Sequence, residues 1–134
     1  MVVDSGVAKT TSRRSNCAVA CTLDLVGDRW TLLIVRDLIG GKTRYADFAA
    51  APEHIPTNIL ADRLKRLERA GLVERMPYQD RPQRMAYRLT PAGWELGRVV
   101  QALATWGLAH LPGTERTIWP NANSPSAPRK TDDE

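Results

Sequence analysis

The residues best suited to recognition chemistry lie in one segment, IPTNILADRLKRLERAGLVER, which covers residues 55–75. Helical spacing of about 100° per residue places three leucines on one side, predicted to face a core: Leu60, Leu64 and Leu67. The opposite side carries four polar or charged residues: Asn58, Asp62, Lys65 and Arg69. Asparagine can pair with two atoms of an adenine edge, and lysine can donate to guanine or to phosphate. The pattern indicates a helix that recognises DNA.

Four residues within or beside this polar face are assigned other contacts. Thr57 and Ala61 flank it, and an alanine can meet a thymine methyl group. Asp62 would repel phosphate, so it either accepts from cytosine or braces a nearby basic side chain. Arg63 lies at the edge of the core side and is assigned to the DNA backbone. For an isolated helix, a solvated face with salt-bridging charges is the commoner explanation.

The distribution of charge favours the DNA-binding interpretation. The chain has 134 residues and a net charge of +4, which suits one soluble domain. Residues 55–98 hold nine Arg or Lys against five Asp or Glu, so this stretch alone accounts for the excess. A basic region coinciding with a candidate recognition helix is the electrostatic footprint of a nucleic-acid binder.

The elements around this helix predict a mainly α fold with a small β-hairpin. Helices are expected over 17–26, 28–40, 44–51, 57–70 and from Thr90 to Leu111, with strands over 72–76 and 84–89. The polar stretch PYQDRPQ, residues 77–83, is expected to be the hairpin loop. Helix, turn, helix and hairpin in this order predict a winged helix-turn-helix.

Further basic residues fall where such a fold approaches DNA. Arg81 and Arg84 lie near the predicted wing tip, which suits phosphate or minor-groove contact. Arg44 heads the helix before the recognition helix and is assigned to a phosphate. Double-stranded DNA is therefore the expected partner.

The chain resembles the HxlR-type winged helix-turn-helix regulators of bacteria. The resemblance covers about residues 17–107 and rests on four segments in order: C…TLDLVGDRWTLLIVRDLIGG, RYADF, IPTNILADRLKRLERAGLVER and PYQDRPQRMAYRLTPAG. It implies a homodimer built from the N- and C-terminal helices, with the fourth helix in the major groove. Two positions depart from the family pattern, Ala18 after the first cysteine and Gln83 in the wing, and the latter puts the wing contacts in doubt.

The resemblance also gives Cys17 a second interpretation. Some similar regulators carry a reactive thiol at this place and sense oxidants or electrophiles, and Cys17 is the matching residue. It could equally be an inert small residue at a helix start. Cys21 lies one turn later and is expected to be a buried structural thiol. A winged helix that binds a protein partner is the remaining alternative, and an oxidant or small molecule could be an effector of the regulator.

Other functional classes have little support in the sequence. No nucleophile with a base, phosphate-binding glycine loop or metal-ligand pattern is evident, so no enzyme, cofactor or metal is expected. No apolar run is long enough for a membrane span, and without a signal peptide a cytoplasmic location is expected. Three parts are predicted: a flexible arm over 1–12, the regulator domain over 13–111 and a Pro/Ser-rich tail over 112–134 that includes Trp119.

Overall fold

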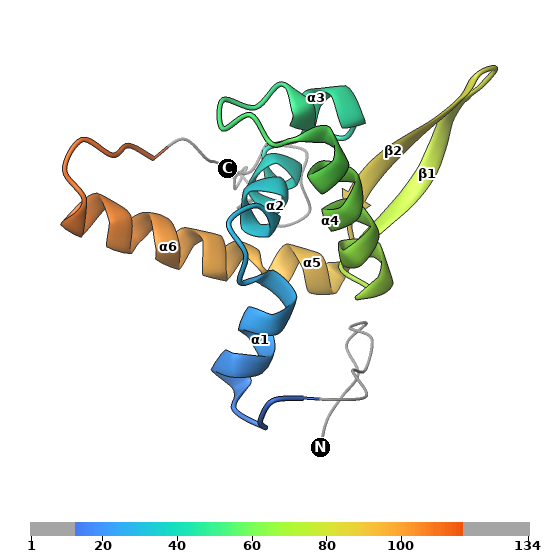
Figure 1. Cartoon of the computed structure of the whole chain (residues 1–134). Coiled ribbons are helices and arrows are strands. Elements are labelled where there is room, and N and C mark those ends of the chain that lie inside the picture. The colour runs from blue at the N-terminus through green and yellow to red at the C-terminus, as the bar shows by residue number, and fades with distance from the viewer. Residues whose placement is uncertain (1–12, 117–134) are drawn as a thin grey trace, which may run out of the picture.

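The computed structural model describes residues 13–116 as a winged helix with two protruding terminal helices (Figure 1). The elements follow the order α1 Ala18–Val26, α2 Thr31–Ile39, α3 Tyr45–Ala49, α4 Thr57–Arg69, β1 Val73–Asp80, β2 Gln83–Leu89, α5 Pro91–Glu95 and α6 Gly97–His110. The predicted mainly α class with one antiparallel hairpin is confirmed. Trp119 and the arm over 1–12 lie outside the described residues.

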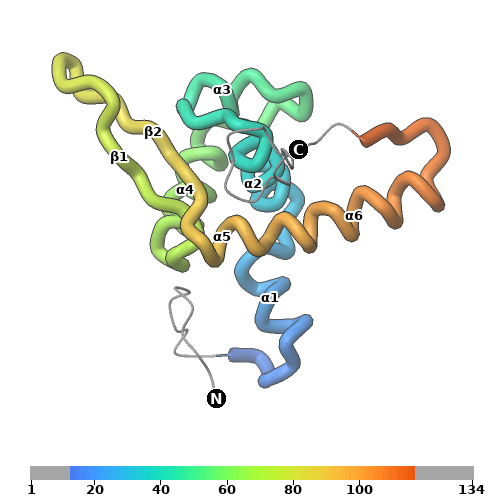
Figure 2. The backbone as a smooth tube through the Cα atoms, turned by 180° about the vertical axis from the view of Figure 1, so that it is seen from behind, coloured from blue at the N-terminus to red at the C-terminus, as the bar shows by residue number. Residues whose placement is uncertain are grey.

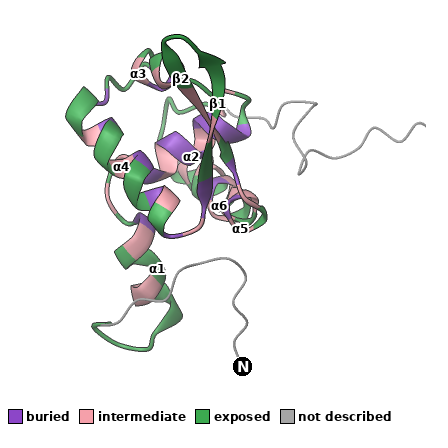
Figure 3. Cartoon of the chain, turned by 90° about the vertical axis from the view of Figure 1, so that its right-hand side faces the viewer, coloured by how far each residue is buried: buried purple, intermediate pink, exposed green. Residues whose placement is uncertain are grey.

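The core forms where α2, α3 and α4 meet the base of the hairpin. Leu60, Leu64 and Leu67 of α4 are almost completely buried, as predicted, and pack in one cluster with Val35 and Phe48. Figure 3 shows that buried residues gather around α2 and the base of the sheet, whereas most of α1 and the hairpin tip is exposed. The arrangement buries one side of α4 and leaves its opposite side open.

The hairpin is longer than the sequence predicted. Pairing continues to Asp80 and Gln83, so the connection is only Arg81-Pro82, and the expected loop over 77–83 is wrong. The outer half projects beyond the core and has no apolar face to bury. Its backbone hydrogen bonds form without the alternating pattern from which strands are recognised.

The C-terminal helix is divided, which the apolar spacing did not reveal. Thr90 caps α5 as predicted, because its Oγ1 accepts from the Gly93 N–H at 3.1 Å and donates to the Gly71 carbonyl at 2.7 Å. Leu96 ends α5, and α6 begins at Gly97, a residue with low helix propensity. Residues 112–116, assigned to the tail from the sequence, turn back along α6, where Arg116 donates to Gln101 at 2.6 Å.

One carboxylate connects the start of α2 with α4. Asp28 caps the start of α2, because its Oδ2 accepts from the backbone N–H groups of Trp30 and Thr31 at 3.1 and 3.3 Å. The same oxygen accepts from Arg63 Nε on α4 at 2.8 Å. Partial burial opposes the charge on Asp28, but the hydrogen bonds from Thr31, Arg63 and Trp30 outweigh it and lower the pKa of Asp28 to about 2.

This carboxylate should make folding stability depend on pH in the acid range. The pKa of Asp28 falls from 3.8 to about 2 on folding, so its contribution is complete well above pH 3.8 and disappears as the pH falls through 2. Asp28→Asn should lower the free energy of unfolding at pH 7 by roughly 1–3 kcal/mol, because bonds to a charged acceptor are lost. It should also flatten the decline in stability between pH 5 and 2. Urea denaturation across this range measures both effects.

Asp24→Asn is the matched control, since Asp24 pairs with Arg14 on the exposed surface of α1. Such a pair contributes about 0–1 kcal/mol, so this variant should retain the acid profile of the wild type. An Asp28→Asn variant with a wild-type profile would contradict the assignment.

Candidate nucleic-acid interface

The outer side of α4 is an exposed polar surface. Asn58, Asp62, Lys65 and Arg69 are all exposed, as the helical spacing predicted. Thr57 and Ala61 are exposed beside them at the N-terminal half of the helix. These residues form what we call the α4 face, and their hydrogen-bonding groups point away from the core.

The turn between α3 and α4 sets the angle at which this face is presented. Tyr45 at the start of α3 donates its hydroxyl to the Thr57 carbonyl at 2.7 Å, which holds the first turn of α4 against α3. Between the helices His54 adopts a φ of 58°, a conformation found mainly in turns. The two helices and this turn make a helix-turn-helix.

Ion pairs divide the basic residues into two groups. Arg36, Arg75 and Arg88 bind Glu53, Glu68 and Glu74 respectively, so their charges are neutralised within the protomer. Leaving Arg13 and Arg116 aside, the described Arg and Lys residues outside any ion pair are Arg29, Arg44, Lys65, Arg69, Arg81 and Arg84. All but Arg29 lie on the α4 face, on the wing or at the start of α3, where uncompensated positive charge can attract phosphate.

Arg63 lies at the edge of the core side, as its spacing predicted, but its charge is paired within the protomer. Its guanidinium binds Asp28 and Asp62, and only 19% of its side chain is exposed. The pKa of Arg63 is raised by the hydrogen bond to Asp28. The sequence could not reveal this partner, because Asp28 lies 35 residues away. Asp62 also approaches Arg66 at 4.0 Å, so of its two proposed roles the structure favours the brace for basic neighbours.

The wing carries the other predicted contacts and one residue that the sequence did not single out. Arg81 and Arg84 are exposed near the tip, beyond the body of the domain. Arg44 lies beside the middle of the wing, where its backbone bridges Ala86, with its guanidinium carbon 4.1 Å from the centroid of the Tyr78 ring. Tyr78 belonged to a stretch predicted as loop, so its position in a strand beside Arg44 is a finding of the structure.

A separate surface on the terminal helices is apolar. Val19 and Leu23 on α1 have the helical spacing of a buried face, yet they are 67% and 53% exposed. Leu103 and Trp106 on α6 belong to an apolar stripe that suits either a core or an interface, and they are 56% and 58% exposed. Both helices extend away from the body of the domain (Figure 2). Nothing in residues 13–116 covers the two faces, so the burial indicated by the spacing of Val19 and Leu23 does not occur within the protomer.

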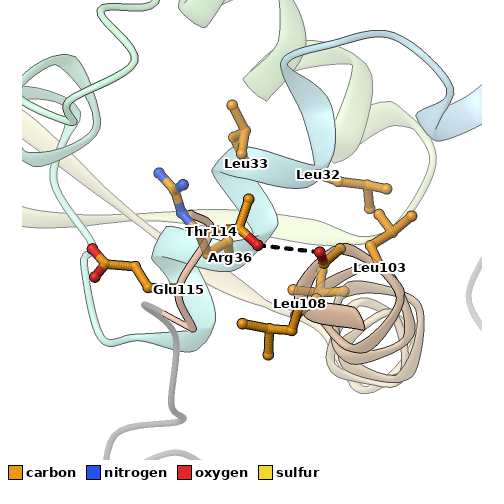
Figure 4. A pocket seen from close by; sticks show the side chains of 10 residues that line it. Leu32, Leu33, Arg36, Leu103, Leu108, Thr114 and Glu115 are labelled. Carbon is orange, nitrogen blue, oxygen red and sulfur yellow. Dashed lines mark hydrogen bonds between the residues drawn. The ribbon is translucent and has the colours of Figure 1, made fainter. Parts of the chain in front are cut away.

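An apolar groove runs between α2 and α6, closed at one end by the turn after α6 (Figure 4). Its volume is about 260 Å³, and Leu32, Leu33 and Leu108 are among its lining residues. Arg36 contributes its aliphatic stem, because its guanidinium binds Glu53 at 2.7 Å. Thr114 donates to the Gly107 carbonyl at 3.1 Å and so holds the closing turn in place. The groove is continuous with the apolar side of α6 at Leu103.

The two cysteines lie at the start of α1 and within its first turn. Cys17 immediately precedes α1 and is exposed, whereas Cys21 is half-buried and its thiol donates to the Ser15 carbonyl at 3.3 Å. The expected full burial of Cys21 is therefore not observed. Within the described part of the chain no cluster of metal-ligating side chains occurs. No helix there has the length and apolar character needed to cross a bilayer.

The similarities to known proteins agree with this architecture. An HTH-type transcriptional regulator of Mycobacterium tuberculosis is 42% identical over 98 residues, which are 73% of this chain and 61% of that protein. This chain thus spans about three fifths of the length of that relative. The HTH-type transcriptional regulator YdeP of Bacillus subtilis is 31% identical over 76% of this chain and 80% of its own length.

A solved structure has the same fold. The redox regulator HypR in its oxidized form superimposes with a TM-score of 0.64 and 30% identity, over 76% of this chain and all of that chain. The family description HxlR-like helix-turn-helix matches residues 25–115, from the end of α1 to the turn after α6. The chain belongs to the HxlR-like helix-turn-helix family.

Proposed function

We propose that the protein regulates transcription by sequence-specific binding to operator DNA as a homodimer. The proposal rests on which basic residues have an acidic partner and which do not. Basic residues elsewhere in the described chain mostly have acidic partners, whereas Lys65, Arg69, Arg81, Arg84 and Arg44 do not. An ion-paired cation would have to leave its partner before binding phosphate, so these residues are the ones ready to do so.

In this proposal α4 enters the major groove and the wing follows the DNA backbone. Thr57, Asn58, Ala61 and Lys65 meet base edges, and Asn58 can bond an adenine through both atoms of its amide. Asp62 steadies Arg66 and Arg63 rather than meeting phosphate. The wing arginines supply affinity without reading sequence. In a two-fold dimer the recognition helices would contact half-sites roughly 34 Å apart in a pseudo-palindrome.

The division between base and phosphate contacts can be tested by two substitutions. Asn58→Ala should weaken binding to the operator by roughly 1–3 kcal/mol and leave binding to scrambled DNA almost unchanged. Arg84→Ala should weaken both and reduce the slope of log affinity against log salt by about 1. Fluorescence anisotropy on the DNA upstream of the protein's own gene, titrated at several salt concentrations, measures these effects.

Arg98→Ala is the control, because Arg98 is an exposed cation on α6 that pairs with Glu95 away from the α4 face. It should change neither affinity nor salt slope. Equal losses on both DNAs for Asn58→Ala would remove base reading from that residue. Weak binding to every DNA by the wild type, insensitive to salt, would instead favour a protein partner for α4.

The dimer is proposed from the apolar faces of α1 and α6. Val19, Leu23, Leu103 and Trp106 form exposed apolar surface on helices that extend beyond the body of the domain. Apolar surface of this kind on a soluble protein usually marks an interaction site. A second copy would present the same faces, which satisfies the self-complementarity of a two-fold interface.

Leu103→Glu should therefore raise the dimer dissociation constant at least about tenfold, because association would bury a charge without a partner. Gln83→Glu is the matched control, since it introduces the same charge on the exposed wing. Sedimentation equilibrium of both variants measures the effect. A Leu103→Glu variant that dimerises as well as the control would place the interface elsewhere.

Thiol sensing by Cys17 is a second candidate function. Cys17 is exposed next to the proposed dimer helix α1, so modification of its thiol could alter the spacing of the recognition helices. The similar structure of HypR is that of a redox regulator, which supports considering this role here. If Cys17 senses oxidants, Cys17→Ser should bind DNA equally before and after oxidant treatment, whereas the wild type should change its affinity.

A further inference from the structure

Tyr78 interrupts the regular pairing of the wing. Pro77 pairs with Met85 and Gln79 with Arg84, so Tyr78 is an extra residue in β1 without a partner in β2. Such a bulge bends the strand and changes the direction in which a side chain points. Here the side chain concerned is a large aromatic ring, 40% exposed, in an otherwise polar part of the hairpin.

The guanidinium of Arg44 lies over the ring of Tyr78. The guanidinium carbon lies 4.1 Å from the ring centroid, within the range of a favourable cation–π contact. Arg44 is also fixed through its backbone, which bridges Ala86 of β2 and donates to Asp47 at 3.3 Å. The neighbouring Thr43 carbonyl accepts from the Tyr87 N–H at 2.8 Å. Both the backbone and the side chain of Arg44 are thus tied to the wing.

The kind of partner matters for what Arg44 can bind. A carboxylate would neutralise the charge and occupy the N–H groups, as happens to Arg63 at Asp28. An aromatic ring carries no net charge and accepts no strong hydrogen bond, so it restrains the guanidinium without neutralising it and leaves N–H groups available for a phosphate. Within the described residues Arg44 makes no ion pair.

The backbone of Arg44 lies close to the start of the recognition helix α4. Arg44 bridges the middle of β2 at Ala86, and the next residue, Tyr45, donates to the Thr57 carbonyl in the first turn of α4, so Arg44 lies between the wing and the start of the recognition helix. A phosphate next to the major groove that α4 enters would be the nearest part of a DNA duplex. Guanidinium edges bind phosphate oxygens through two parallel hydrogen bonds.

We propose that Tyr78 is a positioning residue which holds Arg44 as a binding site for a DNA phosphate, and that the bulge exists to direct its ring there. The inference rests on the proposed DNA-binding function and adds a residue to it. Tyr78 restricts the motion of Arg44 before DNA arrives, so less conformational entropy is lost when the phosphate binds. The ring, and not the hydroxyl, performs this task.

The test compares Tyr78→Phe with Tyr78→Ala by anisotropy titration on operator and scrambled DNA. Tyr78→Phe keeps the ring and should bind like the wild type. Tyr78→Ala should bind both DNAs roughly 2- to 5-fold more weakly, the range expected for a lost exposed cation–π contact. Arg44→Ala should lose at least as much and reduce the salt slope by about 1. Thermal melts of each variant confirm that the wing remains folded.

Double variants separate positioning from a general effect on the wing. If Tyr78 acts through Arg44, Tyr78→Ala should cause little further loss in the Arg44→Ala background. In the Arg84→Ala background it should cause its full loss, because Arg84 is an exposed wing cation with its own contact. Full additivity with Arg44→Ala, or a Tyr78→Phe variant as weak as Tyr78→Ala, would overturn the proposal.

The same titrations distinguish this inference from the function on which it rests. If the wild type binds operator with a steep salt dependence and Tyr78→Ala equals it, only the role of Tyr78 fails. If the wild type binds neither DNA, the proposed function fails and the phosphate site with it.

Discussion

The presentation of α4 depends on a constraint at Asp28. A helix that reads DNA must keep one side in the core while its other side remains open, and leucine packing alone tolerates small rotations about the helix axis. The Asp28 carboxylate removes some of this freedom because it caps the start of α2 and binds Arg63 on α4 at 2.8 Å. Arg63 stands between the buried and exposed sides of α4. The proposed α4 face is therefore positioned by an ion pair at its border, next to the connection between α1 and α2.

Ion pairing also determines which of the other arginines keep an available positive charge. Arg75 and Arg88 bind Glu68 and Glu74, which joins α4 to the wing and the two wing strands to each other. Exposed pairs of this kind contribute little to stability, but they remove positive charge from those places. Arg44 is restrained without neutralisation, because its partner is an aromatic ring. The positive charge of residues 55–98 is thus concentrated on the α4 face and at the wing tip, because the basic residues elsewhere in this segment are ion-paired.

Local pattern was sufficient for some of this organisation and insufficient for the rest. The period of the leucines predicted both sides of α4, because burial of one side is a property of a single helix. The caps at Asp28 and Thr90 were predictable because their partners lie within three residues. The bond from Arg63 to Asp28 and the contact of Arg44 with Tyr78 join distant segments, and nothing in their spacing indicates them. The outer wing was missed because a hairpin in solvent has no apolar alternation.

The terminal helices show a different limit of sequence reasoning. An apolar stripe predicts that a helix face will be covered, but the pattern is identical whether the cover comes from the same chain or from another. Val19, Leu23, Leu103 and Trp106 lie on such stripes, and the protomer leaves them exposed. Their exposure would cost free energy in water, since each large apolar side chain gains about 1.5–3 kcal/mol on complete burial. In the proposed dimer, a second copy of the chain would supply a cover of matching character for both helices at once. Their spacing is thus the one expected of a dimer interface, and the α1 helices that would join the subunits lead directly into Asp28.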